Sequence, residues 1–231
     1  MQTTTPPPSP DRFAWWMRQH ALIMLIGVCS TFIEPSGLLL SAMAGASYLA
    51  LSRITRSDNT HQVDAITART LTIFRMMVAI GLISELPEPS HHISLIGALL
   101  GASTVELCLK WRRQPTSAIQ RLLEQEADSL ALIAILIELI HLGDAGKTLL
   151  LMGLLRPVMV AYAYWSPPAP DDMPRGTTDR ILSLLTLFSL TAPMMPGIPT
   201  GTAPWIIGIA ASAWLYPYAR WLTTITRKSR R

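Results

Sequence analysis

The sequence is poor in charged residues and in cysteine. Only 15% of its 231 residues are Asp, Glu, Lys or Arg, whereas an ordinary soluble domain carries about a quarter. The two cysteines, Cys29 and Cys108, lie far apart in apolar runs, without a CxxC motif or a nearby histidine. This excludes a disulfide framework and a zinc-finger module, and we expect both cysteines to be small packing residues. P-loop, nucleophile-elbow and HExxH motifs and internal repeats are absent as well.

Long apolar runs make up much of what is present. They alternate with short charged connectors, and half of the residues are hydrophobic, a pattern typical of a polytopic helical membrane protein. We predict an all-α integral membrane protein, with a six-span bundle behind an N-terminal membrane hairpin. The expected spans are 68–84, 93–109, 129–143, 148–165, 181–196 and 203–221.

The predicted organisation has five parts. They are a disordered, cytoplasmic Pro/Thr-rich tail (1–20), the hairpin (21–52), a polar connector (53–67), the six-span core (68–222) and a basic C-terminal tail (223–231). The hairpin consists of two apolar runs broken by "EPSG", and it either crosses the membrane or re-enters on the same side. A signal peptide is not expected, because the segment before "AMA" (42–44) is long, contains Glu34-Pro35 and lacks a basic start.

Basic residues gather in alternate connectors. With the N-terminus inside, 17 of the 19 lysines and arginines fall on one side, all but Lys147 and Arg156. This bias predicts cytoplasmic termini and, in a bacterium, the inner membrane. Trp111, Trp165, Trp205 and Trp221 fall at predicted span ends, as an interfacial aromatic belt does. The net charge of +4 suits anionic lipid, and nucleic acid is not an expected partner.

Two acidic residues lie at the inner ends of predicted spans. A charge at the centre of a span costs about 2.5–3.5 kcal/mol, so Glu106 and Asp128 are candidate functional residues. The sequence between them, "AIQRLLEQEA", predicts a short interfacial helix that folds the chain back, so that both carboxylates face one cytoplasmic pocket. The alternative is structural, with Glu106 reaching the interface and Asp128 capping a helix beside Arg121.

These residues resemble the motif of the CDP-alcohol phosphatidyltransferase family, D-x-x-D-G-x-x-A-R, eight residues, then G-x-x-x-D-x-x-x-D. "ARTLTIFRMMVAIGL" is similar to the family's first-span opening, with Arg75 at its usual arginine. Glu106 falls at the first aspartate and Asp128, in "LLEQEADSLAL", at the third. Arg156 matches an arginine common in the fourth span, and "RGTTDRILSLL" resembles the basic opening of the fifth.

The resemblance implies a transferase of phospholipid synthesis that moves a phosphatidyl-type group from a CDP-linked lipid to a small alcohol. It implies Mg²⁺ or Mn²⁺ at Glu106 and Asp128, and a homodimer is possible. It also implies phosphate or nucleotide binding by five basic residues, Lys110, Arg112, Arg113, Arg156 and Arg175; either Arg112 or Arg113 would stand for the motif arginine.

The sequence departs from the motif at two aspartates. Leu109 and Leu132 stand at the second and fourth, and the fourth supplies the family's general base. Loss of a general base typically lowers a rate by 10²–10⁴. The alternative function is therefore a non-catalytic membrane scaffold or lipid-binding relative, a pseudoenzyme.

Overall fold

The structure is a computed structural model that describes residues 10–33, 37–55, 63–84, 89–111, 118–143, 145–165, 177–195 and 198–228. These residues are helical or form short turns, and they contain no strand. The helices are α1 (Pro10–Ile33), α2 (Leu38–Thr55), α3 (Val63–Ile83), α4 (Pro89–Trp111), α5 (Ala118–His141), α6 (Leu151–Trp165), α7 (Thr177–Thr191) and α8 (Ala203–Lys228), with 3-10 turns at Lys147–Leu150, Ala192–Met194 and Thr200–Thr202. The predicted all-α class is confirmed.

Three predicted boundaries are wrong. The segment 1–20 is not entirely a tail, because α1 begins at Pro10; proline is tolerated in the first turn, where its missing N–H would have no helical partner. The connector 53–67 is shorter, since α2 continues to Thr55 and α3 begins at Val63. The interfacial helix and the third span form one continuous helix, α5, because 118–141 contains strong helix formers and no Gly or Pro.

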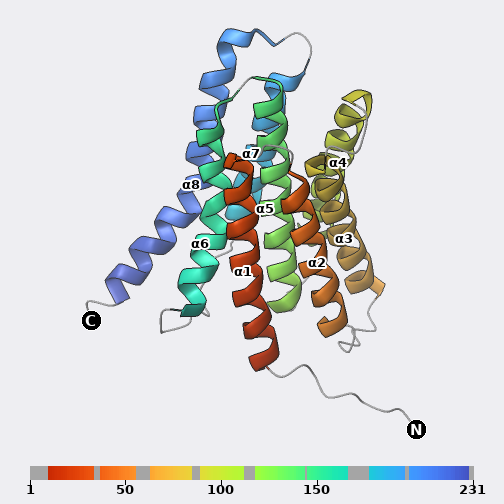
Figure 1. The fold of residues 1–231 in the computed structure, drawn as a ribbon, viewed down its shortest axis with the longest axis vertical. Coiled ribbons are helices and arrows are strands. Elements are labelled where there is room, and N and C mark those ends of the chain that lie inside the picture. The colour runs from red at the N-terminus through yellow and green to blue at the C-terminus, as the bar shows by residue number, and fades with distance from the viewer. Residues whose placement is uncertain are drawn as a thin grey trace.

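Helix α5 is the centre of the bundle. Its side chains from Leu130 to Leu139 are all buried, on every side of the helix, and burial all round is expected of a helix enclosed by others. α3, α6 and α7 pack against it, α1 packs on α2 and α6, α4 on α3, and α8 on α7. Figure 1 shows the helices running up and down, with the start of α1 and the end of α8 at the same end of the bundle.

The turn between α1 and α2 depends on a glycine. Gly37 has a φ of +63°, a conformation that is unfavourable for residues with a Cβ. A Cβ there would lie 2.3 Å from the carbonyl oxygen of Ile83, at the end of α3. Gly27 lets α1 and α2 approach, since its Cβ would lie 2.6 Å from Leu40. Small residues therefore set the close packing of this hairpin.

The bundle has apolar residues outside and charged residues inside. Ile33, Leu49, Ile93 and Trp205 are 88%, 68%, 67% and 77% exposed. Arg75, Glu106, Glu124, Glu126 and Arg156 are buried. By length and composition, Trp15–Ile33 alone among the described segments could cross a membrane; Leu38–Ala50, Thr70–Ile83 and His92–Cys108 are shorter apolar helices. A buried core helix has the same character, so the membrane bundle stays a prediction.

Candidate functional site

Glu106 and Asp128 come together, and a third helix supplies the residue between them. Arg75 of α3 donates through Nη1 to Oε2 of Glu106 and through Nη2 to Oδ1 of Asp128. Thr72, one turn before Arg75, donates to Oε1 of Glu106 at 3.3 Å. Arg75 and Glu106 are buried, and Asp128 is 14% exposed. The guanidinium thus joins α4 and α5 through their two carboxylates.

These side chains line a cavity of about 370 Å³, which we call the Arg75 pocket. Its polar lining consists of Arg75, Ser103, Glu106, Glu124, Asp128 and Arg180. Arg180 of α7 approaches Glu124, with 3.5 Å between Nη2 and Oε2. Three carboxylates and two guanidinium groups from four helices therefore face one small space, and the charges largely compensate each other.

Helical spacing explains why these positions share the pocket. Ser103 and Glu106 are i and i+3 on α4, and Glu124 and Asp128 are i and i+4 on α5, so each pair lies on one face. Leu132, the expected base position, lies one turn beyond Asp128 and is fully buried in the hydrophobic core. Asp128 does not cap a helix either, since α5 begins at Ala118. Sequence reasoning missed Ser103 and Glu124.

A divalent cation does not fit this donor set as it is arranged. Mg²⁺ and Mn²⁺ bind through oxygen ligands, but Arg75 already takes one oxygen from Glu106 and one from Asp128. Among the residues with a described structure, no three His, Cys, Asp or Glu side chains group as metal ligands would. The arrangement suits a guanidinium, and the metal role of Glu106 and Asp128 stays a prediction.

Of the five predicted phosphate-binding residues, only Arg156 has a described side chain, and it does not line this pocket. Arg112, Arg113 and Arg175 lie outside the described residues, and of Lys110 only the backbone, in the last turn of α4, is described. Arg156 of α6 belongs to a different cluster. Its Nε donates to Oε1 of Glu126 at 2.9 Å, and both residues are buried.

That second cluster connects the N-terminal hairpin to the core. Oε2 of Glu126 lies 3.2 Å from Nε2 of His20, and Nδ1 of His20 lies 2.8 Å from Oγ of Ser47. Trp16 stacks on His20 and donates to the carbonyl oxygen of Ser47 at 3.1 Å. Because His20 and Ser47 are 1% and 4% exposed, a substrate cannot reach the serine oxygen. The cluster is a structural link between α1, α2, α5 and α6.

Glu126 precedes the predicted third span (129–143), and its charge is stabilised by this cluster. Burial by itself raises the pKa of a carboxyl group, but Arg156 and His20 outweigh it and lower the pKa of Glu126 to about 2. The sequence placed Trp16 and His20 in the predicted disordered tail 1–20 and predicted no contact between them. It gave no signal that this face of α1 packs on Glu126.

Comparison of the chain with protein-family models, with curated proteins and with solved structures found no match.

Proposed function

We propose that this chain is an integral membrane protein of the CDP-alcohol phosphatidyltransferase type that has no catalytic activity and serves as a membrane scaffold or lipid-binding protein. Its membrane location is supported by the distribution of polarity. Ionisable side chains of a membrane bundle face its interior, and the lipid-facing surface is apolar. In this chain Arg75, Glu106 and Arg156 are buried while Ile93, Trp205 and Ile209 are exposed.

The family proposal is supported by a register that differs from the first one by one helical turn. If Glu106 stands at the second aspartate of the motif, Glu124 takes the third and Asp128 the fourth. The motif places the third aspartate 18 positions after the second, which is the separation of Glu106 and Glu124 without any insertion. Ser103 is then the single aspartate position that lacks an acid, and all four positions line the Arg75 pocket.

The position of Arg75 is the main observation that supports a non-catalytic function. It bridges Glu106 and Asp128, so one carboxylate that would hold a metal ion and the carboxylate that would act as general base already neutralise a buried cation. Breaking a buried ion pair by removing one partner costs about 3–5 kcal/mol. Ser103 offers a hydroxyl where the motif has a third anionic ligand. The pocket therefore stabilises the bundle instead of binding a nucleotide diphosphate.

Catalysis is tested by CMP release. Purified protein is incubated with labelled CDP-diacylglycerol, a panel of small alcohols and Mn²⁺, beside an active enzyme of the family and a Glu106→Ala/Asp128→Ala variant. We expect no more CMP from the wild type than from the variant. Alcohol-dependent CMP release above that variant would overturn the proposal.

Stability supplies the second test. If the acids are structural, Glu106→Gln lowers the unfolding temperature equally with and without Mn²⁺, because Arg75 loses its partner. If they are metal ligands, Mn²⁺ stabilises the wild type and Glu106→Gln abolishes that gain. The two outcomes separate a structural pocket from a metal site even where no acceptor alcohol is found.

A working transferase is the second candidate, favoured by the convergence of three acids at the family's spacing. It requires Arg75 to leave Glu106 and Asp128, so that Glu106 and Glu124 can hold Mg²⁺ or Mn²⁺ and Asp128 can act as the general base. A Ser103→Asp variant restores the missing acid. If the protein is a working transferase, the Ser103→Asp variant binds Mn²⁺ more tightly than the wild type and releases CMP faster. If the pocket is structural, the variant gains neither property.

A further inference from the structure

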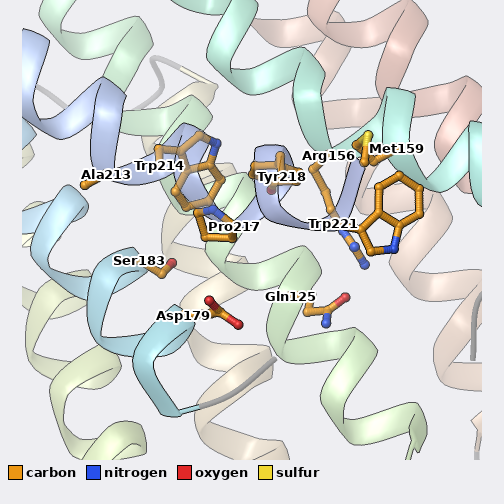
Figure 2. Close-up of a pocket in the computed structure, with 10 residues that line it drawn as sticks. All are labelled: Gln125, Arg156, Met159, Asp179, Ser183, Ala213, Trp214, Pro217, Tyr218 and Trp221. Atoms are coloured by element: carbon orange, nitrogen blue, oxygen red, sulfur yellow. The ribbon is translucent and has the colours of Figure 1, made fainter. Parts of the chain in front are cut away.

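A second cavity, of about 560 Å³, lies between α5, α6, α7 and α8, apart from the Arg75 pocket. Figure 2 shows its lining: Gln125 from α5, Arg156 and Met159 from α6, Asp179 and Ser183 from α7, and a run of α8 residues that includes Trp214 and Trp221. We call it the tryptophan pocket.

Four neutral polar atoms in its lining are buried without a hydrogen-bond partner. They are Oε1 of Gln125, Oγ of Ser183, and the indole Nε1 atoms of Trp214 and Trp221. Each of these side chains is at least nine-tenths buried. A buried polar group without a partner is costly, and nearly all buried polar groups in folded proteins are hydrogen-bonded to protein or to ordered water. Four of them around one cavity indicate a ligand.

The charges around the pocket are already compensated. Arg156 pairs with Glu126, and Asp179 lies 3.6 Å from Arg220. The four neutral atoms without a partner are two indole donors, one amide oxygen that accepts, and one hydroxyl that does both. A hydroxyl group of a ligand can accept from an indole and donate to an amide oxygen. Aromatic rings of Trp214 and Trp221, with Met159, supply apolar surface beside these atoms.

We infer that the tryptophan pocket binds an uncharged, hydroxyl-bearing molecule, either a free sugar or polyol or the corresponding head group of a neutral lipid. Its hydroxyls would accept from the indole N–H groups of Trp214 and Trp221 and donate to Gln125, with Ser183 able to serve as donor or acceptor. This inference does not depend on the Arg75 pocket or on catalysis.

Binding is measured with the purified full chain in an amine-oxide detergent, which carries no sugar. Tryptophan emission is recorded while one of three probes is added. Glucose represents a free sugar, octyl glucoside below its critical micelle concentration represents a lipid head group, and octyl phosphate is the charged comparison. We expect a saturable change with at least one glucose-bearing probe; saturation by glucose identifies a free sugar, and saturation only by octyl glucoside identifies a lipid head group.

Matched variants locate the binding site. Ser183→Ala removes one hydrogen bond and should weaken binding by about tenfold, and Trp214→Phe should remove most of the emission change. Ser94→Ala and Trp205→Phe, at exposed positions outside the pocket, should bind as the wild type does. A lack of saturation with both glucose probes, tighter binding of octyl phosphate, or unchanged binding in both pocket variants would overturn the inference. None of these results changes the expected CMP-release outcome.

Discussion

At the scale of single residues, an acid in an apolar helix raises the question of what neutralises it. For Glu106 and Asp128 the sequence predicted a metal ion, whereas the structure places the guanidinium of Arg75 between them. Arg75 had been recognised only as a matching position in the first span. A guanidinium on one helix can serve two carboxylates on two others because its planar fork donates in fixed directions.

Replacement of Arg75 should therefore destabilise the protein. In Arg75→Met two buried carboxylates lose their common partner, and we expect a loss of about 3–5 kcal/mol in the free energy of unfolding. Chemical unfolding in detergent, followed by circular dichroism, measures it. Arg18→Met, at an exposed position of α1, is the control and should be close to neutral. A stable Arg75→Met protein would show that the bridge contributes little.

Glu126 predicts a dependence of stability on pH. Its pKa falls from an ordinary value of 4.5 to about 2 in the folded chain. The folded state therefore favours the charged form, and this stabilisation is complete above pH 4.5 and is lost as pH falls from 4.5 towards 2. Glu126→Gln should lack that contribution, so its unfolding temperature should decline less steeply than that of the wild type between pH 5 and 3. If the unfolding temperatures of the two proteins declined equally steeply, the lowered pKa assigned to Glu126 would be contradicted.

At the scale of elements, the apolar runs located the helices well but misplaced several helix ends, among them the starts of α1, α3 and α5. The pattern changed at residue 129 from amphipathic to wholly apolar, which suggested two helices. The backbone has no reason to break there, since neither glycine nor proline interrupts α5. As a result two directions are used on one rigid helix: Glu124 and Asp128 share a face and line the Arg75 pocket, and Glu126 points elsewhere and binds Arg156 and His20.

The hairpin turn gives a prediction at this scale. Gly37→Ala combines an unfavourable φ, which costs about 1–2 kcal/mol, with a Cβ only 2.3 Å from the carbonyl oxygen of Ile83. Gly143→Ala shares a positive φ of 80° but meets no atom within 4 Å. We expect thermal unfolding to show a larger loss of stability for Gly37→Ala than for Gly143→Ala. Equal losses of stability would mean that a methyl group at residue 37 does not clash with the end of α3.

At the scale of the whole molecule, the bundle differs from a water-soluble domain in its exposed apolar surface and its buried ion pairs. Charged side chains pair in the interior, and large apolar side chains cover much of the outside. In water such a surface would promote aggregation. In a bilayer the same surface is solvated by lipid, and interior charges are tolerated because they are paired.

We therefore expect the chain to remain in the membrane fraction after alkaline carbonate washing and to require detergent for extraction. A C-terminal green fluorescent protein fusion should be fluorescent in bacteria and a C-terminal alkaline phosphatase fusion inactive, since the basic connectors predict a cytoplasmic C-terminus. Recovery of a monodisperse protein without detergent would contradict membrane integration, and an active phosphatase fusion would reverse the orientation.

The sequence by itself determined the all-α class, the approximate number and order of the helices, and the fact that Glu106 and Asp128 would be exceptional. Local composition is sufficient for these, because a helix forms wherever an apolar run is long enough and unbroken. Only the tertiary structure decided which charges meet. Arg75 is 31 residues from Glu106 and 53 from Asp128, and His20 is 106 residues from Glu126. Contacts at such separations depend on how helices rotate and pack, which no local pattern specifies.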